Sequence, residues 1–191
     1  KQLAGYLVVN NLFLFDSGRH ALYAILMSLN LREGDEVLVQ AFTCNAAVNP
    51  ILWLKARPIY VDVAPGSYNI SLEDLEKKIT PKSKAIIVQH TFGMPAAMDE
   101  ILKIARKHNL FVIEDAAHAL GVKYRTKKLG TWGDAAIFSF GRSKIISPVS
   151  GGAAVVNDKK IAEDLEAFYR SCTPPGKIWI FCALFRSTEI L

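Results

Sequence analysis

The chain has 191 residues, of which 51% are hydrophobic and 21% are charged, and its formal net charge is +5 at pH 7. This balance is typical of a soluble globular domain with a substantial core. The cations are scattered or fall in short groups, such as KYRTKK from Lys123 to Lys128, which we interpret as a solvated face. We therefore expect no nucleic-acid partner.

The chain has three cysteines, Cys44, Cys172 and Cys182, with no C-x-x-C pair among them. This odd number argues against a disulfide framework or a zinc site, and it favours a cytoplasmic location. The apolar run Ile178–Phe185 is too short to span a bilayer, so we expect no integral membrane segment. We interpret this run as a buried helix or a surface that faces a partner. Neither end carries a capping signal, which predicts a fragment of a longer chain.

Strand-like and helix-like segments alternate along the chain. The hydrophobic pattern predicts strands at 36–39, 58–63, 85–89, 110–113, 135–140 and 152–156. It predicts helices at 19–31, 45–54, 71–79, 99–109 and 159–169. The segment 124–129 is predicted to form half of a polar hairpin. This rhythm predicts an α/β fold of three layers, with helices on both faces of a mostly parallel sheet.

In such sheets, ligands bind beyond the carboxyl ends of the strands. Three informative segments fall at junctions of this kind. They are Ser17–Gly18 ahead of the first helix, Asp115 after an apolar strand, and the segment from Ser139 to Lys144. We expect these segments to meet at one edge of the sheet.

Lys144 and Asp115 are the candidates for chemistry. A lysine that forms a covalent bond with a carbonyl compound must be partly desolvated, and the apolar segments around Lys144 could supply that environment. The alternative is a solvated loop lysine. An aspartate that ends an apolar strand is costly to bury unless it meets a cation, such as a protonated pyridine nitrogen. The alternative for Asp115 is a cap for the turn at 116–120.

The segment Ser17–Gly18–Arg19–His20 leads into a helix, whose backbone amides and dipole could hold a phosphate group. An ordinary helix cap is the alternative, and Arg19 could strengthen the anion site or face water. Ser139 is a second candidate phosphate donor, with a plain strand serine as its alternative. Neither His20 nor His118 has metal-ligand spacing, so we expect no metal site.

Four segments match one known pattern in order and spacing: SGRHAL, EDAAHALG, LGTWGDAAIFSF followed by Lys144, and SGGAAVV. Together they resemble the DegT/DnrJ/EryC1/StrS family of sugar aminotransferases, which are fold-type-I enzymes that depend on pyridoxal 5'-phosphate (PLP). The resemblance covers roughly residues 15–158. It implies a PLP-binding large domain at 1–158, and at 159–191 a helix and the start of a connection to a missing small C-terminal domain.

The resemblance also implies roles for individual residues. Lys144 is similar to the lysine that binds the cofactor covalently, and Asp115 to the partner of the pyridine nitrogen. His118 matches a position beside the cofactor ring and its phenolic oxygen. Ser139 resembles the serine that binds the cofactor phosphate.

Several positions depart from the family pattern. Gly141 replaces a frequent histidine, and Ser150 replaces an acidic residue before the glycine pair. Gly18, Arg19 and His20 fall in the phosphate-binding loop, where the family usually places a small hydroxyl residue and an alanine instead of Arg19 and His20. Here the phosphate contact would use backbone amides or the guanidinium group. Cys44 stands where many members have an aromatic ring that stacks on the cofactor.

The family resemblance implies an aminotransferase that moves an amino group from an amino acid, by analogy L-glutamate, to a keto-sugar, usually nucleotide-linked. It further implies a role in cell-surface polysaccharide or amino-sugar biosynthesis and a homodimer with shared active sites. A related branch has histidine in place of the lysine and dehydrates sugars, so Lys144 favours transamination. Two alternatives stay open: an inactive fragment, and a scaffolding or regulatory relative without turnover. The set of Lys144, Asp115 and Ser139 argues against a scaffold.

Overall fold

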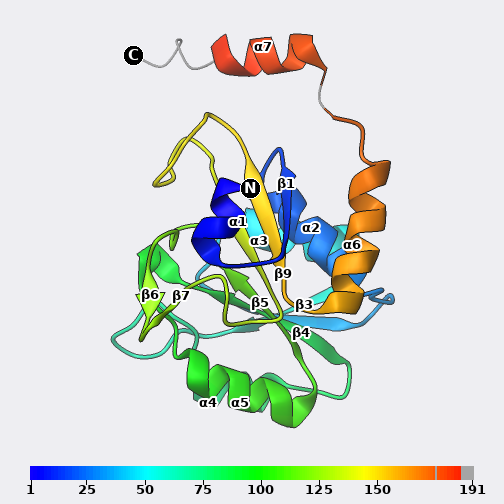
Figure 1. Cartoon of the computed structure of the whole chain (residues 1–191). Coiled ribbons are helices and arrows are strands. Elements are labelled where there is room, and N and C mark those ends of the chain that lie inside the picture. The colour runs from blue at the N-terminus through cyan, green and yellow to red at the C-terminus, as the bar shows by residue number, and fades with distance from the viewer. Residues whose placement is uncertain (175, 186–191) are drawn as a thin grey trace.

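A computed structural model describes residues 1–174 and 176–185, and it places a seven-stranded sheet between helices (Figure 1). The strand order is β1-β9-β8-β5-β4-β2-β3. These strands are β1 Asn11–Phe15, β2 Glu36–Gln40, β3 Arg57–Val61, β4 Ser83–Gln89, β5 Phe111–Asp115, β8 Ala135–Ser139 and β9 Gly152–Val156. Because β9 alone pairs antiparallel with both of its neighbours, the sheet is mostly parallel, as predicted.

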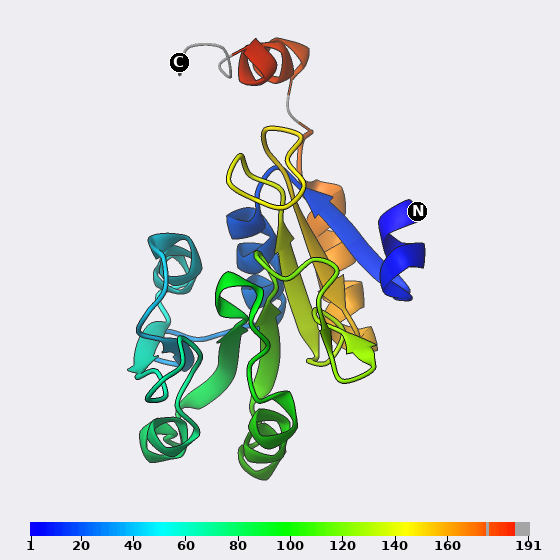
Figure 2. The same cartoon turned by 90° about the vertical axis from the view of Figure 1, so that its left-hand side faces the viewer.

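Helices cover both faces of this sheet (Figure 2). They are α1 Gln2–Leu7, α2 Gly18–Ser28, α3 Asn45–Trp53, α4 Leu72–Lys78, α5 Met98–His108, α6 Lys159–Ser171 and α7 Lys177–Phe185, with a short 3-10 helix, η1, at Thr91–Gly93. On one face α2 packs against α3, α6, β8 and β9, while α4 and α5 pack together on the other. The three predicted layers are therefore present.

Strand β4 shows why the central strands are apolar throughout. Ala85 and Ile87 pack into the cluster formed with α2, α3 and α6, whereas Ile86 and Val88 pack into the cluster under α4 and α5. Successive side chains of a strand point to opposite faces, so a strand covered on both sides needs a continuous hydrophobic run. All four of these side chains are at most 1% exposed.

A third cluster extends the α4 and α5 face toward the N-terminus. Leu7 of α1 packs with Ala136 and Phe138 of β8 and with Val155 of β9. A two-stranded hairpin, β6 Lys123–Tyr124 and β7 Lys127–Lys128, lies beside this cluster. We predicted only half a hairpin at 124–129, which is wrong, because both strands fit within 123–128 and each has two residues.

The sequence pattern missed α1 and β1. Strand β1 is an edge strand, and its side chains are mostly half-buried while Leu14 is exposed, so its apolar run NLFLF shows no clean alternation. Helix α1 has six residues and no side-chain cap at its start. Short uncapped helices and edge strands carry weak local signals, because their stability comes from tertiary packing.

The apolar run near the C-terminus forms α7, in which Ile178 is 82% exposed and Phe181 is 61% exposed. The expectation of a buried helix is thus wrong for these two side chains. The side chains of Trp179 and of residues 183–185, together with residues 175 and 186–191 of the predicted connection, lie outside the described residues. The division of the chain after Asp158 stays a prediction.

All three cysteines have free, exposed thiols. None of the helices in residues 1–174 and 176–185 has the length and apolar character that a membrane span requires.

Candidate active site

Asp115 ends β5 at the carboxyl edge of the sheet, between Gln89 of β4 and Ile137 of β8. Its side chain is buried, and its Oδ1 accepts a hydrogen bond of 3.0 Å from the backbone amide of Ala117. The predicted capping of the turn is therefore present. Among the described residues, no other donor reaches this carboxylate within hydrogen-bonding distance, so it retains the capacity to bind a cation.

Burial raises the pKa of Asp115 above its ordinary value. The hydrogen bond from Ala117 and the positive charges of Lys144, His118 and His90 oppose this shift but do not cancel it. A cation close to the carboxylate would favour its ionised form. The position of Asp115 thus suits a carboxylate whose partner is supplied by a ligand.

Lys144 and His118 meet at the same edge. The Nζ atom of Lys144 lies 2.8 Å from Nε2 of His118, although the two residues are 26 positions apart. Lys144 is held in a turn, because its backbone amide donates to the carbonyl of Gly141 at 2.9 Å. The structure therefore brings the predicted amine and the predicted ring-side histidine into direct contact.

The pKa of His118 is lowered by burial and by the positive charge of Lys144, while Asp115 opposes the shift. A neutral imidazole has one free acceptor nitrogen, and an ammonium group has only donors. In its ammonium form, Lys144 can therefore only donate to the free acceptor nitrogen of a neutral His118. This contact fixes the direction of the lysine side chain and gives its proton an acceptor.

Phe92 is a site residue that sequence reasoning missed. Its ring stacks on that of His118, with centroids 6.1 Å apart and an interplanar angle of 20°. Phe92 has φ 54° and ψ 25°, a left-handed conformation that is uncommon for an aromatic residue. The only sequence signal is the tetrapeptide HTFG after β4, since His90 to Gly93 form the turn.

Phe92 also belongs to a group of three exposed aromatic rings. Phe42 and Tyr68 lie 5.5 Å apart between centroids, and each is within 6.2 Å of Phe92. Beneath them the amide nitrogen of the buried Gln40 donates to the carbonyl groups of Phe42 and Tyr68. We call Phe42, Tyr68 and Phe92 the aromatic surface; it adjoins His118.

Gly18 and Ser139 are in direct contact in the predicted phosphate region. A Cβ atom built on Gly18 would lie 2.9 Å from the Cβ of Ser139, which is too close for any side chain. Ser17 caps α2 by accepting a hydrogen bond of 3.2 Å from the amide of His20. The ordinary cap is therefore present, and the start of α2 packs directly against β8, which places the Ser139 hydroxyl beside the first turn of the helix. The backbone amides of that turn and the hydroxyl are the candidate donors for an anion.

The other predicted residues lie less centrally. Arg19 and His20 are exposed, and the ring of His20 binds the carboxylate of Asp16. Cys44 is exposed at the start of α3, without a side-chain cap. Within the described interactions, none joins these three residues to Asp115, His118 or Lys144.

The remaining predicted residues offer three kinds of chemical group. They offer an amine at Lys144, a buried carboxylate without a cation at Asp115, and an anion cradle at Gly18 and Ser139. This set fits a group that has a carbonyl carbon, a basic ring nitrogen and a phosphate, as PLP does. By contrast, the described side chains contain no group of three or more His, Cys, Asp or Glu residues placed to hold a metal ion.

The sheet order and its covering helices define the fold of the fold-type-I class of PLP-dependent enzymes. The family model of the DegT/DnrJ/EryC1/StrS aminotransferase family matches residues 1–177. The chain belongs to this family, and the resemblance noted from its sequence motifs is confirmed.

Individual relatives support the assignment. The chain is 39% identical to GDP-perosamine synthase of Caulobacter vibrioides over 181 residues, which cover 95% of this chain and 49% of that protein. It is 41% identical over 140 residues to a UDP-N-acetyl-3-dehydro-alpha-D-glucosamine 3-aminotransferase of Acidithiobacillus ferrooxidans, covering 73% of this chain and 38% of that protein.

The fold also matches solved structures. An aminotransferase from Psychrobacter cryohalolentis superimposes with a TM-score of 0.84 at 31% identity, over 92% of this chain and 47% of that one. The fold class predicted from the sequence is thereby confirmed. The chain spans about half the length of the relatives it matches, or less.

Proposed function

We propose that this chain carries the cofactor-binding half of a PLP-dependent aminotransferase that moves an amino group from L-glutamate to a nucleotide-linked keto-sugar. The observation that carries the proposal is the 2.8 Å contact between Lys144 Nζ and His118 Nε2 beside the buried Asp115. A solvated loop lysine would have no need of such a partner. The names of the relatives, which include two nucleotide-sugar enzymes, support the acceptor class.

When bound, PLP supplies an aldehyde carbon that reacts with amines and a ring that accepts electrons. In this proposal Lys144 is the residue that would hold that carbon covalently. Asp115 holds a proton on the ring nitrogen, because its buried carboxylate gains from a cationic partner. Gly18 and Ser139 hold the phosphate through the backbone amides at the start of α2 and the serine hydroxyl.

The amine of Lys144, when it is free, would move a proton at the substrate carbon. His118 orients this amine, since its Nε2 lies within hydrogen-bonding distance. The exposed aromatic surface beside His118 provides apolar ring faces against which the acceptor sugar can pack. A homodimer with shared sites, a cytoplasmic location and a role in surface-polysaccharide synthesis are parts of the same proposal.

The test is a titration of the purified chain with PLP, followed by borohydride reduction and peptide mapping. We expect a visible absorbance band that reduction fixes on Lys144, and its loss in Lys144→Ala. Lys160→Ala, at an exposed position on α6, is the control for nonspecific reaction of PLP with lysines. Labelling spread equally over both lysines would contradict the assignment.

A second measurement separates turnover from mere cofactor binding. Addition of L-glutamate to the PLP-loaded chain is expected to convert the absorbance to that of the amino form of the cofactor. Bound cofactor that never converts would favour the scaffolding alternative. A well-folded chain that binds no PLP would favour the inactive fragment.

A further inference from the structure

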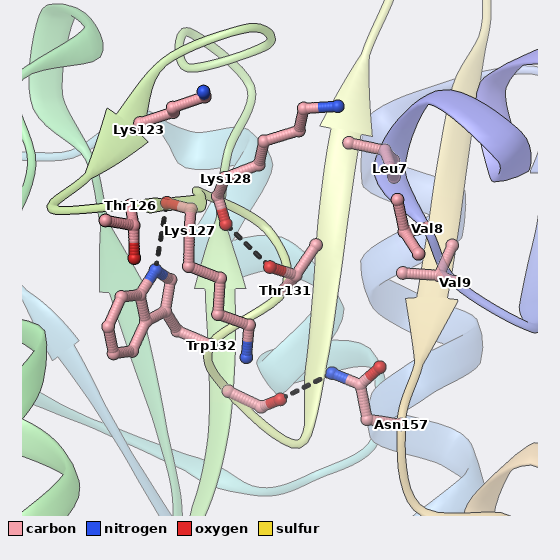
Figure 3. A pocket seen from close by; sticks show the side chains of 11 residues that line it. Leu7, Val8, Val9, Lys123, Thr126, Lys127, Lys128, Thr131, Trp132 and Asn157 are labelled. Carbon is pink, nitrogen blue, oxygen red and sulfur yellow. Dashed lines mark hydrogen bonds between the residues drawn. The ribbon is translucent and has the colours of Figure 1, made fainter.

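A pocket of about 570 Å³ lies between α1 and the β6–β7 hairpin (Figure 3). In that view Lys127 extends to one end of it, whereas Lys123 and Lys128 lie at the other, so these ammonium groups do not meet at one point. The pocket borders Gly133, which precedes β8, whereas Lys144 follows that strand, and five strand residues span about 17 Å. The short helix η1, which follows β4, lies much closer to the candidate active site, because it contacts one of its residues.

Phe92 of η1 has a backbone conformation that its own side chain makes unfavourable. With φ 54° and ψ 25° it lies in the left-handed region, which is costly for a residue that has a Cβ atom. Its ring is 64% exposed, so burial of the ring does little to offset this cost. Strain of this kind persists where the surrounding structure fixes it, and it often marks a functional position. The side chain of Phe92 therefore contributes something other than stability of the core.

Buried polar contacts hold the chain next to Phe92. The backbone amide of Thr91 donates to Oδ1 of Asn69 at 3.1 Å. The hydroxyl of Thr91 donates to the carbonyl of Tyr68 and accepts from the amide of Gln40, both at 2.9 Å. Thr91 is 1% exposed, and breaking these contacts would leave buried polar groups without partners. The turn is thus fixed from below, and Phe92 is kept in its strained conformation.

Gly93 brings the same turn close to the backbone of His118. It has φ 81°, and a Cβ atom built on it would lie 3.0 Å from the carbonyl oxygen of His118. A glycine permits both this conformation and this close approach. The ring of Phe92 then stacks on the imidazole, with centroids 6.1 Å apart and an interplanar angle of 20°. The backbone of the turn and the ring of Phe92 therefore both lie against His118.

We propose that Phe92 is a positioning residue whose ring holds the imidazole of His118 toward the amine of Lys144. The Nε2 atom of His118 lies 2.8 Å from Nζ of Lys144, and rotation of the imidazole would carry Nε2 away from the amine. A ring stacked on one face of the imidazole restricts that rotation. The effect of Phe92 on turnover rests on the proposed function, whereas its effect on His118 is a property of the chain without cofactor.

The stack also shields the imidazole from water. Burial lowers the pKa of His118, the charge of Lys144 lowers it further, and the charge of Asp115 opposes the shift. Among the described residues these are the two charged groups that face the imidazole, and Thr91–Gly93 carries no titratable side chain. Removing the ring of Phe92 should admit water and raise the pKa of His118 toward its ordinary value of 6.5.

The test is an NMR pH titration of the histidine ring signals in the full, cofactor-free chain, with His118→Gln to assign the signal. We expect Phe92→Leu to raise the pKa of His118 and Phe92→Tyr, which keeps a ring, to leave it unchanged. Phe42→Leu is the matched control. Phe42 belongs to the same aromatic surface, but its described ring contacts are with Tyr68 and Phe92.

Phe92→Gly separates loss of the ring from damage to the turn. Glycine adopts the left-handed conformation without a steric cost, so the urea midpoint should be no lower than that of the wild type, while the pKa of His118 rises as in Phe92→Leu. A second readout is the rate at which PLP and borohydride label Lys144. We expect this rate to fall about tenfold or more in both variants, because the amine loses its orientation.

Three results would overturn the proposal. They are an unchanged pKa of His118 in Phe92→Leu and Phe92→Gly, an equal rise in Phe42→Leu, which would indicate general opening of the aromatic surface, and an unchanged rate of labelling at Lys144. A wild-type chain in which PLP labels no lysine would contradict the proposed function instead. The pKa of His118 would then still decide whether Phe92 holds the imidazole.

Discussion

Two consecutive carboxylates at the end of β5, Glu114 and Asp115, are both buried but have opposite surroundings. Glu114 accepts hydrogen bonds from His90 Nε2 at 3.0 Å and from three backbone amides, those of Gly130 and Gly133 at 2.8 Å and of Trp132 at 2.5 Å. Asp115 accepts one, from Ala117. Alternation along the strand directs them to opposite faces of the sheet.

This difference separates a structural role from a functional one. A carboxylate has about four acceptor positions, and Glu114 fills all of them with protein donors, so it ties the loop at 130–133 to β5. Asp115 keeps its positions open at the edge where Lys144 and His118 meet. A buried carboxylate with unused acceptors is costly for the fold, which indicates a ligand as the missing partner.

Removing the satisfied carboxylate is expected to have the largest effect. Glu114→Ala leaves three backbone amides and one imidazole N–H without an acceptor in a buried region. We expect the free energy of unfolding to fall by about 3–5 kcal/mol. Urea denaturation measures this loss. A change below about 1 kcal/mol would show that Glu114 does not hold the loop, and the comparison with Asp115 would fail.

His90→Gln tests a single contact of the same network. The Nδ1 atom of His90 accepts a hydrogen bond of 3.2 Å from the amide of Ala96, so its proton is on Nε2, which donates to Glu114. Glutamine cannot make both contacts in this geometry. We expect a loss of about 1–3 kcal/mol in unfolding free energy. In Glu114→Ala the same substitution should cost less, and a fully additive double variant would contradict the coupling.

Asp115→Asn should have little effect on the stability of the cofactor-free chain at neutral pH. The substitution removes a desolvated charge, so we expect the free energy of unfolding to stay within about 1 kcal/mol of wild type or to rise. Under the proposed function, the reaction with glutamate should still slow by about 10²-fold or more. Stopped-flow absorbance and urea denaturation on the same samples measure both effects.

The pH dependence of this variant follows from the raised pKa of Asp115. Below the ordinary value of 3.8 the carboxyl group is protonated in both the folded and the unfolded chain and has no effect. As the pH rises from 3.8 through the folded pKa, the unfolded chain loses the proton first, and the wild type loses stability relative to Asp115→Asn. An opposite trend would mean that a cation of the protein already neutralises this carboxylate.

Much of the fold follows from local patterns in the sequence. Apolar runs such as Ala85–Gln89 predicted the central strands because burial on both faces demands them, and Ser17 predicted the start of α2 because a hydroxyl caps it. Asp115 was a candidate because a polar residue there ends an apolar strand, whereas Lys144, in the loop after β8, became the preferred candidate through the family resemblance. These signals are local, so a single sequence reveals them.

The features that sequence reasoning missed depend on contacts between distant segments. The stacking of Phe92 on His118 and the pairing of His90 with Glu114 join two strands and their following loops. The pocket between α1 and the β6–β7 hairpin depends on the cross-strand pairing of Lys123 with Lys128 and on the placement of α1. The sequence showed only a basic segment at 123–128. The sequence of a hairpin does not indicate which of its faces will pack beside another helix.

His118→Gln is expected to have the smallest effect, because its side chain is only partly buried. The lowered pKa of His118 means that the unfolded chain takes up a proton first as the pH falls below 6.5. The wild type should therefore lose stability relative to His118→Gln from 6.5 down to the folded pKa. Urea denaturation on both sides of that pH measures the difference, and parallel profiles would contradict the prediction. Because the charge of Lys144 contributes to the shift, Lys144→Met should shrink the difference, which would show that the lysine and histidine are paired before any cofactor binds.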